Sequence, residues 1–265
     1  VPARKASETE LETVHTKEHI ARIKKESATR LGGDGGDLTT PFARGGYEIA
    51  AMAAGGAIEL FEAVLSGDVN NGYALIRPPG HHAAYDMYGG YCFLNNAAIA
   101  AQSLRDKGMD RIAIVDVDFH HGNGTQDIFY TRDDVLFLSL HGDPMDAFPH
   151  FLGHADETGT GRGLGFNHNY PMPPGTSFDT WRSNLKNALA KVIAFKPNAI
   201  IISLGVDTFE TDPISFFKLK SPDFTTIGTD IAALDLPTLF IMEGGYDIAE
   251  IGLNTVNVLT GFEAV

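Results

Sequence analysis

Short apolar runs alternate with amphipathic segments along most of the chain. The apolar runs predict strands at residues 73–76, 111–115, 135–140, 199–204 and 238–242. Apolar residues at helical spacing predict helices at residues 9–25, 47–65, 95–107, 181–195, 222–234 and 249–259. Buried strands that alternate with helices indicate an α/β fold with a central, mostly parallel sheet and helices on both faces.

Glycine-rich segments interrupt this alternation. Residues 32–37 contain four glycines, which predicts a loop, and residues 153–165 predict a long ordered loop. The length of 265 residues is typical of one α/β domain, so we expect a single domain over residues 1–265. Because the chain begins with Val1 and not with Met, we also expect its N-terminal portion to be truncated.

Four polar motifs follow directly on predicted strands. Residues 77–82, 116–123, 205–212 and 243–246 each begin where an apolar run ends. In parallel α/β sheets, ligands bind beyond the carboxyl ends of the strands. We therefore expect the four motifs to converge on one cleft.

The motif that begins at Asp116 carries two carboxylates beside two imidazoles. Alternate residues of an extended chain point to the same side, so Asp116, Asp118 and His120 can face one site. Adjacent carboxylates repel each other when buried, and a cation removes this repulsion. Asp207 ends another apolar strand; alone it is equally well explained as a helix N-cap, but beside the motif it supplies a third ligand. Asp118, His120 and Asp207 match the three protein ligands of a catalytic zinc.

Proton-transfer and carbonyl-polarising groups accompany these ligands. His81 and His82 follow a Pro-Pro-Gly turn, and histidine is the usual proton-transfer residue near neutral pH. We expect Asp116 to orient His81 and the neutral Asn123 to orient His82. Tyr246 follows a glycine pair and can donate a hydrogen bond to a carbonyl opposite the metal.

The substrate side of the site is predicted from charge and from a second glycine-rich segment. Acidic residues exceed basic ones by 34 to 20, for a formal charge of -14, which argues against nucleic-acid binding and favours a small cationic ligand. Gly90 and Tyr91 are expected to line an apolar substrate channel. Asp34 and Asp37 are further candidates for contact with a cationic substrate.

Cellular context is predicted from cysteine content and hydropathy. Cys92 is the single cysteine, so an internal disulfide is excluded and a reducing cytoplasm is expected. We find no apolar run of about 18 residues, the length that spans a membrane. No membrane partner is therefore expected.

These motifs together resemble the histone deacetylase and acetylpolyamine amidohydrolase superfamily. The resemblance runs from about residue 45 to the end, and residues 141–144, 147–153 and 212–219 are most similar to bacterial acetylpolyamine amidohydrolases. It implies an arginase/deacetylase-like three-layer fold and zinc-dependent release of acetate from acetylpolyamines or acetyl-lysine. It also implies that His82 is the general base and acid and that Tyr246 polarises the acetyl carbonyl.

The resemblance implies a structural potassium ion as well. Its ligands would be Asp116, Asp118, His120, Ser139 and Leu140.

Three other interpretations remain open. Residues 32–65 are more similar to broad-specificity class II deacetylases, which makes a protein deacetylase the first alternative. An arginase-type ureohydrolase with two manganese ions would need another acid where Asn123 stands. A catalytically silent protein that binds acetylated ligands is the third. Assembly into a homo-oligomer is also expected.

Overall fold

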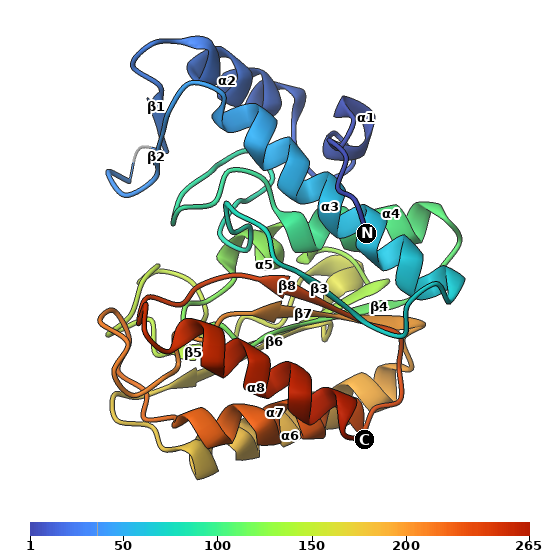
Figure 1. Ribbon diagram of the computed structural model, residues 1–265, viewed down its shortest axis with the longest axis vertical. Helices are drawn as coiled ribbons and strands as arrows, with labels where there is room; N and C mark the ends of the chain where they lie inside the picture. The colour runs from blue at the N-terminus through green and yellow to red at the C-terminus, as the bar shows by residue number, and fades with distance from the viewer. Residues whose placement is uncertain (36) are drawn as a thin grey trace.

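A six-stranded parallel sheet forms the centre of the computed structural model, which describes residues 1–35 and 37–265 (Figure 1). Its strands, in spatial order, are β3 (Gly72–Ala74), β8 (Thr238–Met242), β7 (Ala199–Leu204), β4 (Ile112–Asp116), β5 (Val135–Gly142) and β6 (Asn167–Met172). Every neighbouring pair is parallel, so the predicted parallel sheet is confirmed. A separate antiparallel pair joins β1 (Gly33–Asp34) to β2 (Pro41–Phe42).

Helices cover both faces of this sheet (Figure 1). On one face lie α1 (Glu8–Leu11), α2 (Lys17–Ala28), α3 (Gly46–Ser66), α4 (Asn96–Asp106) and α5 (Asn123–Phe129). On the other face lie α6 (Phe178–Phe195), α7 (Ser221–Ala232) and α8 (Ile251–Glu263). A short 3-10 helix, η1 (Gly161–Gly163), lies between β5 and β6.

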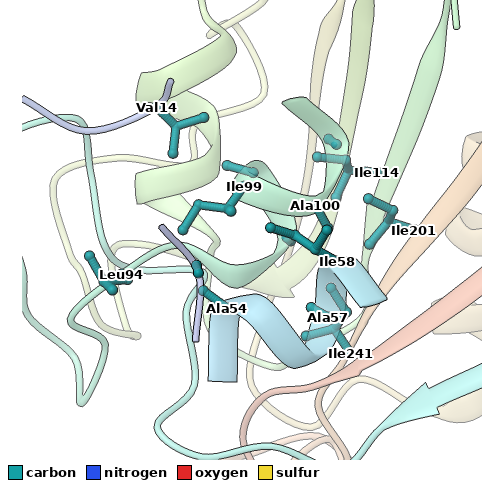
Figure 2. Close-up of a cluster of buried hydrophobic side chains, with 14 of the residues drawn as sticks. Val14, Ala54, Ala57, Ile58, Leu94, Ile99, Ala100, Ile114, Ile201 and Ile241 are labelled. Carbon is teal, nitrogen blue, oxygen red and sulfur yellow. The ribbon is translucent and has the colours of Figure 1, made fainter. Parts of the chain in front are cut away.

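The alternation of side chains along each strand divides the core into two layers. Ile114, Ile201 and Ile241 pack against α3 and α4, where Ile58 and Ile99 meet them (Figure 2). The neighbouring residues along the same strands pack against the helices on the other face. Strands buried on both faces are apolar throughout, which is why the runs were visible in the sequence.

From the sequence we expected no apolar run long enough to span a membrane, and helix α3 shows that this was wrong. Its length and mean hydropathy of 1.5 would allow it to cross a membrane, although no such run was identified from the sequence. In the fold, Ala54, Ala57, Ile58 and Phe61 are buried against the sheet and α4. Packing in the core therefore accounts for the apolar character of this helix.

The structure differs from the predicted elements in several places. The helix predicted at residues 9–25 is two helices, because the Thr16 side chain accepts a hydrogen bond from the His19 N–H and begins α2 anew. Helix α5 and strand β6 were not predicted. The loop predicted at residues 32–37 contains β1, and Gly36 lies outside the described residues.

Candidate active site

The four polar motifs lie beyond the carboxyl ends of β3, β8, β7 and β4, which are neighbours in the sheet. Hydrogen bonds join the motifs to one another. The Gly80 N–H after β3 donates to Glu243 Oε2 after β8 at 2.7 Å, and the Phe119 N–H after β4 donates to Asp207 Oδ1 after β7 at 2.8 Å. The predicted convergence on one site is thus observed.

Asp118, His120 and Asp207 form a compact cluster of buried ligand atoms. One nitrogen or oxygen atom of each lies within 4.8 Å of the others. His120 Nδ1 is 2.9 Å from Asp207 Oδ2 and 3.3 Å from Asp118 Oδ1. Backbone N–H groups of His120 and Gly244 donate to the two oxygens of Asp118, at 2.8 and 2.7 Å, and fix its carboxylate.

The electrostatics of this cluster favour a bound cation. Burial, followed by the nearby charge of Asp118, raises the pKa of Asp207 to about 7. Burial alone would also raise the pKa of Asp118, but His81 and His120 hold it below its usual range. Two carboxylates buried this closely repel each other, and a divalent ion between them would remove that cost.

Two glycines keep space open around the carboxylates. A Cβ atom at Gly205 would lie 2.1 Å from Asp118 Oδ2. A Cβ atom at Gly244 would lie 2.6 Å from the same oxygen and 2.8 Å from Asp207 Oδ2. With two carboxylates and one imidazole, the donor set fits a divalent ion with nitrogen and oxygen ligands, such as zinc.

The two histidines after β3 have different hydrogen-bond partners. His81 Nδ1 lies 2.9 Å from Asp116 Oδ2, and His82 Nδ1 lies 2.6 Å from Asn123 Oδ1. These are the partners that the sequence suggested. The centroids of the two rings are 4.0 Å apart, so a charge on one is felt strongly by the other.

The surroundings of the two rings shift their pKa values in opposite directions. Burial alone would lower the pKa of His81, but the carboxylates of Asp116 and Asp118 raise it well above its usual value. Burial, followed by the charges of His81 and His120, lowers the pKa of His82 well below its usual value. The site therefore combines a cationic His81 with a neutral His82, as an acid–base pair requires.

A cavity of about 290 Å³ opens onto these groups. Its lining includes Thr39, His82, Gly90, Tyr91, Phe119, His120, Asp146, Ala147, Phe148, His150, Ile214, Phe216 and Tyr246. Tyr246 is held by its backbone N–H, which donates to Asp212 Oδ2 at 2.7 Å, and its ring centroid is 6.0 Å from that of Tyr91. Burial, followed by the charges of Asp118 and Asp207, raises the pKa of Tyr246 well above its usual value.

The sequence profile of the histone deacetylase domain matches residues 1–262. The chain belongs to the histone deacetylase domain family. The family resemblance stated from the motifs is therefore confirmed.

Two bacterial members of the family illustrate the similarity. The chain is 58% identical over 222 residues to the acetylpolyamine amidohydrolase of Mycoplana ramosa, covering 84% of this chain and 65% of that one. It is 54% identical over 227 residues to acetylpolyamine amidohydrolase 1 of Pseudomonas aeruginosa, covering 86% and 65%. The chain thus spans about 65% of the length of these relatives.

A solved structure of this family shares the fold. The crystal structure of acetylpolyamine aminohydrolase from Burkholderia pseudomallei superposes with a TM-score of 0.90 at 35% identity, covering 99% of this chain and 84% of that one. This likeness confirms the predicted arginase/deacetylase-like fold.

Three of the predicted potassium ligands lie on two neighbouring strands, and the other two belong to the ligand cluster. Asp116 at the end of β4 is paired in register with Ser139 on β5, and Leu140 follows Ser139. Ser139 Oγ lies 2.8 Å from His141 Nδ1. Asp118 and His120 follow β4 directly, so all five residues lie at the same edge of the sheet.

Asp37 has a different role from the substrate contact suggested by the sequence. Its Oδ1 accepts from the N–H groups of Thr39 and Thr40, and its Oδ2 accepts from the Thr40 hydroxyl and the Gly90 N–H. Burial alone would raise the pKa of Asp37, but hydrogen bonds from Gly90, Thr39 and Thr40 lower it to about 2. Asp37 therefore fixes the backbone at Gly90, where φ is +54°. Thr40 Oγ1 accepts from the Tyr91 N–H at 2.9 Å and fixes the next residue, where φ is +68°.

Glu243 is the functional residue whose role the sequence did not reveal. Its Oε2 accepts from the N–H groups of Gly80 and His81, at 2.7 and 3.2 Å, and so anchors the turn that carries both histidines. Its Oε1 is buried without a hydrogen-bond partner among the described residues. Burial, with the charge of Asp116, raises the pKa of Glu243 to about 7 although His81 opposes the shift.

Replacing Glu243 by glutamine tests this anchoring through its pH dependence. An acid whose pKa is raised from 4.5 to about 7 on folding stabilises the fold below pH 4.5, and this contribution is lost as the pH rises through 7. Glutamine keeps an acceptor oxygen but does not ionise. We expect the free energy of unfolding of Glu243→Gln, relative to that of the parent, to increase by about 2–3 kcal/mol when the pH is raised from 5 to 8. Urea unfolding of the metal-free proteins measures this difference.

Glu243→Ala is the matched control. It leaves two buried N–H groups without an acceptor, so its free energy of unfolding should be about 2–4 kcal/mol below that of the parent at pH 5. Because alanine does not ionise either, this deficit should shrink by the same amount of about 2–3 kcal/mol by pH 8, so that the difference between the alanine and glutamine variants stays constant. A glutamine variant whose relative stability did not change between the two pH values would contradict the raised pKa.

Proposed function

We propose that this chain hydrolyses N-acetyl amines with a zinc ion held by Asp118, His120 and Asp207, and that it prefers acetylpolyamines to acetyl-lysine peptides. One observation carries the proposal: His82, His120 and Tyr246 all line the same cavity. A metal ligand, a neutral imidazole and a phenol thus face one bound molecule. The names of the two bacterial relatives support the preference for acetylpolyamines.

When bound, zinc would polarise the acetyl carbonyl and acidify a water molecule. Because two carboxylates already balance its charge, the protein must add a strong base and an oxyanion donor. His82 suits the first role: Asn123 holds its Nδ1, so the neutral ring offers Nε2 as the atom that takes a proton from water. The same nitrogen can then return the proton to the leaving amine.

His81 and Tyr246 stabilise the negative oxygen that forms on the acetyl carbon. Asp116 keeps His81 charged, and this charge lies beside His82 throughout the reaction. Burial keeps the Tyr246 hydroxyl protonated, so it can donate to the carbonyl oxygen as the negative charge develops there. Phe148, whose ring centroid is 5.0 Å from that of His82, limits the access of water to the base.

A potassium ion at Asp116, Asp118, His120, Ser139 and Leu140 belongs to the same proposal, and the register that pairs Asp116 with Ser139 supports it. Residence in the cytoplasm is supported by the free, buried Cys92. A homo-oligomer and a single catalytic domain over residues 1–265 stay predictions.

Substrate turnover tests the proposed function. We expect the zinc-loaded protein to show a higher kcat/KM on acetylputrescine and acetylspermidine than on an acetyl-lysine peptide. A higher value on the peptide would favour the protein deacetylase alternative. Tight binding of all three without turnover would support the silent binder, and two manganese ions per chain with urea release from arginine would support the ureohydrolase.

A further inference from the structure

The cavity has a wall formed by Asp146, Ala147 and Phe148, which lie just beyond β5. Backbone hydrogen bonds hold this wall in place. The Asp143 N–H donates to the Met172 carbonyl at the end of β6, and the Asp143 carbonyl accepts from the N–H groups of Asp146 and Ala147, each at 2.8 Å. Asp146 is therefore fixed on a well-held segment, two residues from the ring that contacts His82.

Asp146 differs in its surroundings from the other acids of this region. Among the described residues that line the cavity it is the only acid, and it is exposed to solvent. Within residues 1–35 and 37–265, no hydrogen bond or ion pair reaches its carboxylate, whereas Asp37 is occupied by four donors. The Asp146 carboxylate is thus available to a ligand.

Apolar side chains line the same cavity as this carboxylate and the reacting groups. Tyr91, Phe148 and Ile214 line the same cavity and are 43%, 37% and 44% exposed. Such surfaces favour the methylene groups of a linear chain over water. The cavity therefore presents, in one space, a carbonyl-binding end at His82 and Tyr246, an apolar stretch and an anionic group.

We propose that Asp146 is an ammonium subsite that binds the positively charged far end of a monoacetylated linear diamine or polyamine. The proposal rests on the proposed function, because it places the acetyl group at His82 and Tyr246. In this proposal, one carboxylate in the cavity selects a cationic substrate. Its effect adds to the long-range attraction that the formal charge of -14 exerts on any cation.

A pair of substrates that differ only in charge tests the subsite. Acetylputrescine ends in an ammonium group, and N-pentylacetamide has a methyl group in its place. For Asp146→Asn we expect KM for acetylputrescine to rise about threefold to fivefold, the effect of one exposed ion pair, with kcat unchanged. KM for N-pentylacetamide should stay the same, and high salt should shrink the difference for acetylputrescine.

Asp110→Asn is the matched control. It removes the same charge from an exposed position just before β4, at the amino ends of the strands and so at the end of the sheet away from the cavity. It should leave both KM values unchanged. Equal effects of the two variants would assign the preference to overall charge and overturn the subsite.

The subsite and the proposed function fail in different ways. If the parent protein hydrolyses both amides and Asp146→Asn keeps the parental KM for acetylputrescine, the subsite is wrong and the hydrolase stands. If the parent hydrolyses neither amide, the proposed function is wrong. In that case, calorimetry of the parent and of Asp146→Asn still tests the subsite, through the ratio of the dissociation constants for acetylputrescine and N-pentylacetamide. The same ratio in both proteins would overturn the subsite.

Discussion

Asp207→Asn is expected to abolish hydrolysis and zinc binding while it stabilises the metal-free protein. Asparagine keeps the oxygen that accepts the Phe119 N–H but removes one of the two buried carboxylates of the ligand cluster. Zinc affinity should fall by more than about 100-fold, since even groups that only support metal ligands contribute 10–100-fold. Burial and Asp118 raise the pKa of Asp207 to about 7. Above that pH, the free energy of unfolding of the metal-free variant should therefore exceed that of the parent by about 2–4 kcal/mol.

Zinc content and urea unfolding at pH 8, with and without zinc, measure both effects. The parent should be stabilised by zinc, because an ion that binds only the folded state adds free energy of unfolding. The variant should be more stable than the parent without zinc and should gain nothing when zinc is added. Parental zinc affinity in the variant would exclude Asp207 from the ligand set.

Tyr246→Phe is expected to lower kcat by about 10²–10³-fold and to leave KM nearly unchanged, because the lost hydroxyl acts on a charge that exists only in the transition state. The rest of the site should be preserved. No described residue forms a hydrogen bond with the Tyr246 hydroxyl, and the contact of its ring with Tyr91 and its backbone bond to Asp212 do not need the hydroxyl. Zinc content and unfolding midpoint should match those of the parent.

Tyr91→Phe supplies the control for this prediction. It removes the same atom from the neighbouring ring in the same cavity, and it should change kcat less than about threefold. If the two variants lost activity equally, a general loss of cavity polarity would explain the result and Tyr246 would have no special role.

The strands of the sheet show which elements the local pattern of apolar residues predicts and which it does not. The predicted bounds of β7 and β8 agree with the structure, because strands buried on both faces are apolar throughout. Strand β6 was missed because its inward side chains include Asn167 and Asn169. Both donate to Gln126 Oε1, at 2.9 and 2.8 Å, and this acceptor lies more than 40 residues earlier in the chain.

In the ligand cluster, too, the sequence predicts some features and the fold decides others. Its residue types and their positions at strand ends were readable, because charged side chains directly after buried strands must lie at the edge of the sheet. Their hydrogen-bond geometry was not readable. Asp37 and Glu243 are ordinary acids in the sequence, and their functions as anchors for Gly90 and for the histidine turn depend on backbone donors supplied by the fold.

The sequence by itself determined the fold class, the family and the chemical character of the site, because strand hydropathy and metal-binding side chains are local properties. The tertiary structure decided which groups meet. Glu243 reaches Gly80 across 163 residues, and Asp207 reaches the Phe119 N–H across 88. Only the order of strands in the sheet brings such residues within hydrogen-bonding distance. The same arrangement places Asp146 at the wall of the cavity.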